Sequence, residues 1–253
     1  MTTIDLNCDL GESFGAYKMG NDDEILPFVS SINIACGFHA GDPTVMRQTV
    51  EKALQHNVAI GAHPGFPDLI GFGRRNMYVS PSEVYDYVLY QIGALDGFVK
   101  AAGGNMHHVK PHGALYNMAA TDSEIADAIA KAISHINPEL LLYGLANSDA
   151  FTRAAEKYNL TFVQEAFADR TYKQDGTLTS RTEENALIKN EDEAINQVLQ
   201  MVKEGYVEAV TGGKVALQAQ TICLHGDGEK AVQFARRICR TFELNGISIS
   251  APK

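Results

Sequence analysis

Residues 4–9 read Ile-Asp-Leu-Asn-Cys-Asp and alternate between apolar and polar side chains without a break. Successive side chains of a β-strand point to opposite sides, so this stretch predicts a strand with one apolar face and one polar face. The apolar face suits packing beneath helices. The polar face ends at Asp9, at the carboxyl end of the predicted strand.

The same alternation recurs in three later segments, residues 31–36, 58–62 and 220–224. One face of each is aliphatic, and the other carries small or polar side chains that lead to His39, His63 and His225. An open sheet covered by helices on both sides would have apolar residues on both faces. The lumen of a barrel accommodates a polar face, so the pattern favours a barrel over an open doubly wound sheet.

Short apolar segments alternate with helical ones along the chain, which predicts parallel strands joined by helical crossovers. Asp42-Pro43 and a capping box from Ser80 to Glu83 mark two of the helix starts. About seven βα units predict an α/β fold, an irregular TIM-like (β/α)7 barrel, as a single domain over residues 1–253. The predicted strands are Ile4–Asp9, Ser31–Cys36, Val58–Ala62, His107–Lys110, Leu140–Leu145, Thr161–Ala166 and Gln220–Leu224.

The 253 residues include 21 Lys and Arg against 31 Asp and Glu, which gives a formal net charge of −10. A field of that sign repels nucleic-acid backbones and anionic membrane surfaces, so neither is an expected partner. The amino-terminal residues lack the pattern of a secretory signal, and no apolar run is long enough for a transmembrane helix. The four cysteines form no C-x-x-C pair and suit a reducing compartment. We therefore expect a cytoplasmic protein.

In α/β barrels the active site lies at the carboxyl ends of the strands. Those ends should bring together Asp9, His39 and His63, with further ionisable groups around the rim: Lys110, His112, Glu165 and His225. A single histidine at a strand end is more often structural than a ligand, but so many buried ionisable groups require partners. A divalent metal held by Asp9, His39 and His63 would satisfy three of them. The alternative is a metal-free hydrogen-bonded network that binds the substrate.

Lys110 and the loop arginines each have two interpretations. Lys110 could form a Schiff base, or it could neutralise an anionic group of the substrate. Arg74, Arg75 and Arg170 could recognise an anion with two hydrogen bonds each, or they could be solvated loop charges. The segment 212–215 is not a Walker A loop, so the sequence does not indicate how this chain would bind ATP.

Six motifs that contain these strand ends resemble the LamB/YcsF family, and the resemblance runs from residue 5 to about residue 245. The motifs are DLNCDLGESFG (Asp5–Gly15), NIACGFHAGD (Asn33–Asp42), GAHPGFPD (Gly61–Asp68) with GFGRR (Gly71–Arg75), HVKPHGALYN (His108–Asn117), EAFADR (Glu165–Arg170) and CLHGD (Cys223–Asp227). The resemblance implies a seven-stranded barrel related to the glycoside hydrolase and polysaccharide deacetylase barrels. It also implies work beside two partner subunits, B and C, in the ATP-dependent cleavage of 5-oxoproline to glutamate, ADP and phosphate.

Within that chemistry we expect Asp9 or His63 to act as general base, and Lys110, His112 or a metal to stabilise the oxyanion. ATP is then a co-substrate and a divalent metal the candidate cofactor. Substrate contacts are expected from six further polar residues: Asn7, Glu12, Arg75, Glu165, Arg170 and His225. The alternatives are a metal-dependent amide hydrolase that deacetylates an N-acetyl sugar, a non-catalytic binding subunit, and an aldolase that uses Lys110.

Overall fold

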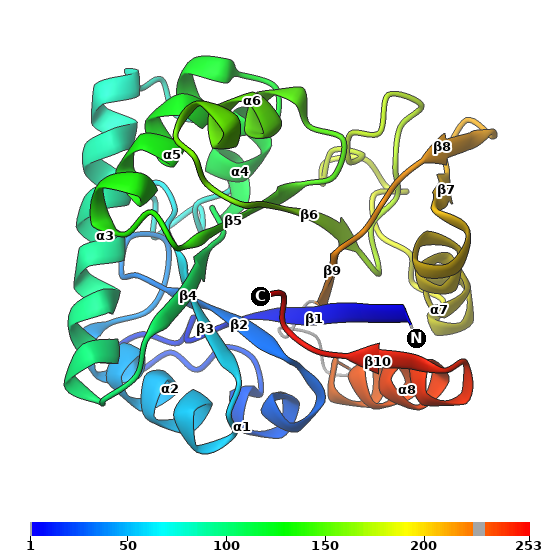
Figure 1. Ribbon diagram of the computed structural model, residues 1–253, viewed down its shortest axis with the longest axis horizontal. Coiled ribbons are helices and arrows are strands. Elements are labelled where there is room, and N and C mark those ends of the chain that lie inside the picture. Colours follow the sequence, from blue (N-terminus) through cyan, green and yellow to red (C-terminus); the bar gives the residue numbers. More distant parts are fainter. Residues whose placement is uncertain (1, 225–230) are drawn as a thin grey trace.

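Seven parallel strands close into a barrel in the computed structural model, which describes residues 2–224 and 231–253 (Figure 1). Neighbouring strands pair in the order β1, β2, β3, β4, β5, β6 and β9, and β9 pairs again with β1. The predicted irregular barrel is confirmed, and the ends of the predicted strands agree to within one or two residues. The strands are β1 (Thr2–Leu10), β2 (Ser31–Ala35), β3 (Ala59–His63), β4 (Met106–Val109), β5 (Leu141–Leu145), β6 (Phe162–Phe167) and β9 (Thr221–Leu224).

Helices cover the outside of the barrel (Figure 1). Asp42 caps the first long helix by accepting hydrogen bonds from the backbone of residues 44 and 45, and Ser80 and Glu83 form the predicted capping box. None of the described helices is long and apolar enough to cross a membrane. The helices are α1 (Asp22–Ile25), η1 (Leu26–Phe28), α2 (Pro43–Gln55), α3 (Pro81–Ala101), α4 (Gly113–Ala119), α5 (Ser123–Ile136), α6 (Asp149–Lys157), α7 (Glu191–Leu199), η2 (Gln200–Glu204) and α8 (Ala231–Leu244).

The two faces of β1 are placed as its alternation predicts. Leu6 and Cys8 are fully buried in the apolar layer beneath the helices. Asn7 and Asp9 instead reach across the lumen, where both accept hydrogen bonds from the side-chain amide of Asn33 in β2, each at 2.8 Å. Polar side chains therefore fill the lumen, and they do so by bonding to one another.

The amino-terminal half of the lumen is occupied by hydroxyl groups around Asp5. The carboxylate of Asp5 accepts hydrogen bonds from Ser30, Ser31, Tyr143 and Thr221 at 2.6–3.0 Å. Asp5 is only 1% exposed. This half of the barrel is a closed, fully bonded interior.

Three short strands were not predicted. β10 (Ile247–Ile249) pairs in parallel with the first residues of β1, and β7 (Tyr206–Glu208) and β8 (Lys214–Ala216) form a separate antiparallel hairpin. A strand of three residues is too short for a recognisable alternation, so these strands could not be predicted from the sequence. Figure 1 places the hairpin at the side of the barrel, beyond β6 and β9.

Candidate functional site

The carboxyl ends of β1, β4 and β6 bring Asp9, Lys110 and Glu165 together in one ionic network. The ammonium nitrogen of Lys110 lies 2.9 Å from Asp9 Oδ1 and 2.8 Å from Glu165 Oε1. The same nitrogen lies 3.0 Å from Asn7 Oδ1 and 3.1 Å from Cys223 Sγ. An ammonium group has three hydrogens to donate. Lys110 therefore has no hydrogen left for a ligand unless it releases one of these neighbours.

The charges of this network stabilise one another against burial. Burial alone would raise the pKa of Asp9, but His63 and Lys110 together outweigh it and hold this pKa well below its usual range. Burial lowers the pKa of Lys110, and the carboxylates of Asp9 and Glu165 raise it to well above its usual range. Lys110 is therefore an ammonium ion at neutral pH. This argues against the Schiff base, which needs a neutral amine.

Two imidazole rings, those of His63 and His112, face each other beside Asp9. His63 donates from Nδ1 to the Lys110 carbonyl at 2.7 Å, and His112 donates from Nε2 to the Phe72 carbonyl at 2.8 Å. The other two ring nitrogens, His63 Nε2 and His112 Nδ1, lie 2.9 Å apart. If both rings were neutral, these two nitrogens would present lone pairs to each other. The pair is therefore satisfied only when it holds an additional proton or binds a cation.

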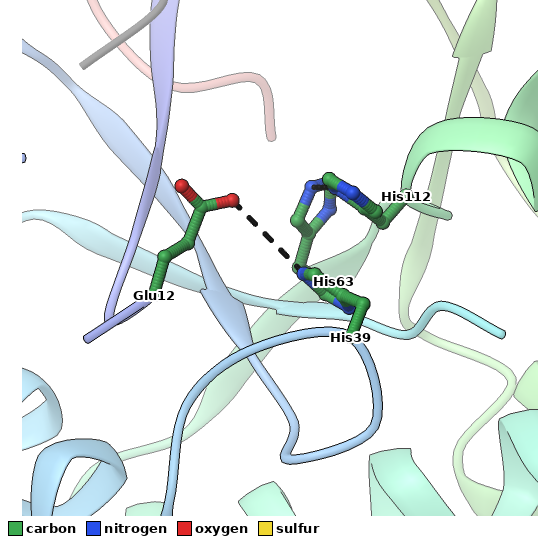
Figure 2. Close-up of side chains that lie close together, drawn as sticks. All are labelled: Glu12, His39, His63 and His112. Atoms are coloured by element: carbon green, nitrogen blue, oxygen red, sulfur yellow. Dashed lines mark hydrogen bonds and ion pairs between the residues drawn. The ribbon is translucent and has the colours of Figure 1, made fainter. Parts of the chain in front are cut away.

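His39 and Glu12 complete a cluster of four side chains that point toward one another from separate segments (Figure 2). The His39 ring stacks on that of His112 with centroids 3.7 Å apart, and its Nε2 lies 4.0 Å from Glu12 Oε1. The potential ligand atoms of the imidazole cluster, which is Glu12, His39, His63 and His112, all lie within 4.8 Å of one another.

The state of these rings fits a metal site. His39 is fully buried, and neither of its ring nitrogens has a hydrogen-bond partner among the described residues. Burial, reinforced by the neighbouring imidazoles, lowers the pKa of His39 well below its usual range, and burial does the same for the pKa of His112. Neutral rings offer lone pairs, and three histidines with one carboxylate form a donor set that zinc accepts.

The cluster differs from the predicted metal set in two members. The sequence predicted Asp9, His39 and His63 as ligands. The structure gathers His39 and His63 with Glu12 and His112, which were expected at the site in other roles. Asp9 stands beside the cluster, with its Oδ2 3.3 Å from His63 Nε2. Its Oδ1 is held by the Lys110–Asn33 side of the network.

The loop after β3 is fastened to the start of α4. Gly73 has a φ of +61°, and a β-carbon there would lie 2.9 Å from His112 Cδ2, so the position requires glycine. The Gly73 carbonyl accepts a hydrogen bond from the Ala114 N–H at 2.9 Å. The preceding carbonyl, that of Phe72, holds the His112 ring. Ile70, at the tip of the same loop, is 95% exposed.

A small cavity opens over these groups, and we call it the inner cavity. Its walls include Asp9, His63, Lys110 and Tyr116. Its volume is about 50 Å³, which is room for about three to five waters at about 10–15 Å³ each. The sequence argument missed Tyr116, which lies one helical turn after His112 in the HVKPHGALYN motif.

The Tyr116 hydroxyl lies beside the carboxylate of Glu165, which is a hydrogen-bond acceptor for it. The hydroxyl and Oε2 of Glu165 are both buried, and neither has another hydrogen-bond partner among the described residues. Burial and the negative charge of Glu165 raise the pKa of Tyr116 well above its usual range. The hydroxyl therefore remains protonated and can donate its hydrogen to Glu165 or into the inner cavity.

The predicted arginines are placed differently from one another. Arg170 lies in the wall of the inner cavity and is 4% exposed. The exposed guanidinium group of Arg75 is paired with Asp68 and does not line the cavity, whereas its neighbour Arg74 does. His225 lies outside the described residues, so the structure does not place it.

Comparison with known proteins agrees with this arrangement of motifs. Residues 4–253 match the LamB/YcsF family. The chain belongs to this family. It is 90% identical over 252 residues to a protein of Bacillus mycoides named as the A subunit of 5-oxoprolinase, with 100% of this chain and 99% of the relative covered. A protein of the same name from Bacillus cereus is 89% identical over the full length of both chains.

Solved structures extend the comparison to the fold. The lactam utilization protein of Thermus thermophilus, 48% identical, superposes with a TM-score of 0.93 over 99% of this chain and 100% of that chain. The catalytic domain of a peptidoglycan N-acetylglucosamine deacetylase from Eubacterium rectale has a TM-score of 0.53 at 9% identity, over 100% and 89% of the two chains. At that identity the likeness is one of fold alone. It confirms that this barrel has the predicted likeness in fold to a deacetylase barrel.

Proposed function

We propose that this chain is the A subunit of a 5-oxoprolinase and carries out the hydrolytic part of the ATP-dependent cleavage of 5-oxoproline to glutamate. Its partners are then subunits B and C, and ATP is a co-substrate of the assembly. One observation carries the proposal. Asp9, His63 and His112 meet at a small cavity, in a chain 90% identical to a relative that bears this enzyme's name.

The reaction needs ATP because a five-membered lactam is a weak electrophile. Transfer of the γ-phosphoryl group to the lactam oxygen releases ADP and makes C5 electrophilic. Water adds to C5 and gives up a proton, and cleavage of the C5–N bond, with a proton delivered to nitrogen, opens the ring to γ-glutamyl phosphate. A second water then displaces phosphate. One ATP and two waters thus yield glutamate, ADP and phosphate.

The Asp9–His63 pair suits the proton transfers of this sequence. His63 donates from Nδ1 to the Lys110 carbonyl, which leaves its Nε2, 3.3 Å from Asp9 Oδ2, as the nitrogen that can take up a proton. Because its pKa is lowered, Asp9 is ionised at neutral pH and stabilises a proton that arrives on the imidazole. All hydrogens of the Lys110 ammonium group are engaged, so Lys110 contributes by holding the Asp9 carboxylate in place beside His63. Tyr116 lines the cavity and is the hydroxyl that could donate to the oxyanion, whereas the N–H of His112 is held by the Phe72 carbonyl, so His112 would act there only through a bound cation.

The predicted substrate contacts have different places in this scheme. Asn7 and Glu165 lie beneath the cavity and act through Lys110. Arg170 lies in the cavity wall, where it can reach the substrate carboxylate. Glu12 belongs to the imidazole cluster. Arg75, which is paired with Asp68, and His225 stay proposed contacts.

The imidazole cluster fits a divalent cation such as zinc. The fit rests on the unpartnered nitrogens of His39 and on the facing nitrogens of His63 and His112. A cation held there would lower the pKa of a bound water and polarise the oxygen on C5. Elemental analysis of dialysed protein tests this. We expect bound metal in the wild-type chain and at least tenfold weaker retention in His39→Gln, and equal retention would contradict it.

A metal-dependent amide hydrolase that needs no ATP is the second candidate. The imidazole cluster favours it, together with the fold shared with a deacetylase. It predicts metal-dependent release of acetate from an N-acetyl sugar in the absence of ATP. A non-catalytic subunit, by contrast, would leave the assembly fully active when the cavity residues are replaced.

Reconstitution distinguishes these functions. The purified chain is mixed with subunits B and C, 5-oxoproline and ATP, and glutamate is measured with each component left out in turn. We expect glutamate to require this chain and to be lost in Asp9→Asn and His63→Ala, while Arg240→Gln, on an exposed part of α8, serves as the control. Full activity without the chain, or with both cavity variants, would contradict the proposal.

A further inference from the structure

Within the lumen, the side-chain amide of Asn33 in β2 connects Asp9 to a buried histidine. The Asn33 Nδ2 atom donates to Asp9 Oδ1 and to Asn7 Oδ1, each at 2.8 Å. The Asn33 Oδ1 atom lies 2.8 Å from Nε2 of His108 in β4. Asn33 and His108 are both fully buried, and neither of them lines the inner cavity. Any influence of His108 on the reaction would therefore pass through Asn33 and Asp9.

The partners of Asn33 determine which end of its amide is the oxygen. The Lys110 ammonium group donates to Asp9 Oδ1 at 2.9 Å and to Asn7 Oδ1 at 3.0 Å, so both of these oxygens are acceptors. The atom of Asn33 that faces both of them must be the amide nitrogen, which has two hydrogens to donate. The amide oxygen then faces His108 and can only accept, so His108 Nε2 carries the hydrogen of that contact.

A neighbouring histidine favours this position of the His108 hydrogen. Burial lowers the pKa of His108 well below its usual range, so the ring is neutral and carries one ring hydrogen. With that hydrogen on Nε2, its Nδ1 accepts from His107 Nδ1, which lies 2.9 Å away. The other ring nitrogen of His107 lies 2.9 Å from the Pro252 carbonyl. A chain of hydrogen bonds thus runs from a backbone carbonyl through two imidazoles and one amide to Asp9.

The fold leaves space for the His108 ring and holds it there. The ring stacks on that of Tyr143, with centroids 4.0 Å apart and an angle of 17° between the planes. On the neighbouring strand β3, a β-carbon at Gly61 would lie 2.2 Å from His108 Nε2, so a larger residue does not fit. A phenyl ring could fill the same space. Packing alone therefore does not require an imidazole at this position, whereas the hydrogen bond to Asn33 does.

From these contacts we infer that His108 is a positioning residue for Asp9: its Nε2 hydrogen holds the Asn33 amide in the orientation that binds the Asp9 carboxylate. Without that donor, the Asn33 oxygen would be a buried acceptor with no hydrogen, which costs more than one neutral hydrogen bond contributes. The Asn33 side chain would then turn toward another donor and release Asp9. The consequence for catalysis rests on the proposed function, and the placing of Asp9 does not.

The hydrogen on His108 can be observed in the wild-type chain, where the fold is unchanged. In ¹⁵N-labelled protein, nitrogen chemical shifts distinguish a ring nitrogen that carries a hydrogen from one that does not, and the spectrum of His108→Gln identifies the signals of this ring. We expect Nε2 of His108 to carry a hydrogen. An Nε2 without a hydrogen overturns the inference.

Two substitutions separate the hydrogen bond from the packing. His108→Phe keeps a ring that can stack on Tyr143 and loses the donor, whereas His108→Gln keeps an amide donor. In crystal structures of the two variants, we expect the contact between Asn33 Nδ2 and Asp9 Oδ1 to be kept in His108→Gln and broken in His108→Phe. An intact contact in His108→Phe overturns the inference.

Glutamate formation by the reconstituted assembly measures the effect on catalysis. His108→Phe should lower kcat by about tenfold to a hundredfold through misplacement of Asp9, and should leave KM within about twofold because no substrate contact is lost. His108→Gln should keep most of the wild-type kcat. His56→Phe makes the same change at an exposed position and serves as the control. A wild-type kcat in folded His108→Phe overturns the inference.

A double variant tests whether His108 acts through Asn33. If it does, His108→Phe combined with Asn33→Ala should be no slower than Asn33→Ala alone, because the amide that His108 holds is already gone. Losses that multiply in the double variant overturn the inference. A wild-type assembly that forms no glutamate would instead refute the proposed function, and the nitrogen shifts and crystal contacts would still decide whether His108 positions Asp9.

Discussion

Asp5 and Asp9 lie on the same face of β1, and they differ entirely in what surrounds them. Asp5 is enclosed by hydroxyl groups that donate to both of its oxygens. Asp9 bonds to the Lys110 ammonium and lies beside an imidazole, at the wall of a cavity. The strand alternation places both carboxylates in the lumen and does not distinguish them.

The difference shows that the role of a buried carboxylate depends on whether its hydrogen-bonding neighbours can release or accept a proton. Hydroxyl groups satisfy Asp5, which is only 1% exposed, and they do not give up protons near neutral pH. Beside Asp9 stands an imidazole, the side chain that most often transfers protons in general acid–base catalysis. Asp5 thus fastens strands together, and Asp9 is placed to support proton transfer.

The largest effect should come from Asp9→Asn. The amide oxygen can still accept from Lys110 and Asn33, as Oδ1 does, and the amide N–H can donate to His63, so the fold should persist. Loss of the charge should lower glutamate formation by the assembly by a factor on the order of 10²–10⁴. Thermal unfolding of the same sample checks the fold. A variant that keeps more than a tenth of the activity would remove Asp9 from the mechanism.

Lys110→Met should have the largest effect on stability. It leaves Asp9 and Glu165 as neighbouring buried carboxylates without their cation, which costs roughly 3–5 kcal/mol of unfolding free energy. Urea titration measures this. Adding Glu165→Gln should restore part of the stability but none of the activity. An unchanged urea midpoint in the single variant would show that the network is not stabilising.

Asp5→Asn should show the opposite profile from Asp9→Asn. Its hydroxyl partners lose a charged acceptor, so the unfolding free energy should fall by about 1–3 kcal/mol. The activity of each folded molecule should stay at the wild-type value, because Asp5 lies away from the cavity. A lowered kcat in fully folded Asp5→Asn would show that the two halves of the lumen are coupled.

The smallest and most gradual effect should be that of pH on protein stripped of metal. The folded-state pKa values of His39 and His112 are lowered from 6.5, so below that pH the unfolded chain binds more protons than the folded one. Stability should therefore be complete above pH 6.5 and decrease as the pH falls below it. Calorimetry over that range measures the slope, and His39→Gln should flatten it. An identical slope in the variant would exclude His39 as a source.

The strands, and the face of each strand that carries polar side chains into the lumen, were predictable, because alternation is a local property of the chain. Asp9, His63 and Lys110 followed from it, since each stands at or next to a strand end. The full membership of the imidazole cluster did not follow from it, because Glu12 and His112 reach the cluster from segments that leave the strands.

The choice between Arg74 and Arg75 depended on a turn that the sequence did not reveal. Phe72 and Gly73 both have positive φ angles, 52° and 61°, and this pair of residues decides which adjacent arginine faces the cavity. A non-glycine residue in that conformation is uncommon, and nothing in the sequence marks Phe72 for it.

The loop after β3 connects the protein surface to the centre of the site. Its outer end, at Ile70, is exposed to solvent. At its inner end, the Phe72 carbonyl accepts a hydrogen bond from the His112 ring, and the Gly73 carbonyl accepts one from the first turn of α4. A displacement of the loop at Ile70 would therefore have to pass through only a few residues of backbone to reach an imidazole at the centre of the site. Ile70 at the outer surface and the carbonyl that orients the His112 ring are thus only two residues apart in the same loop.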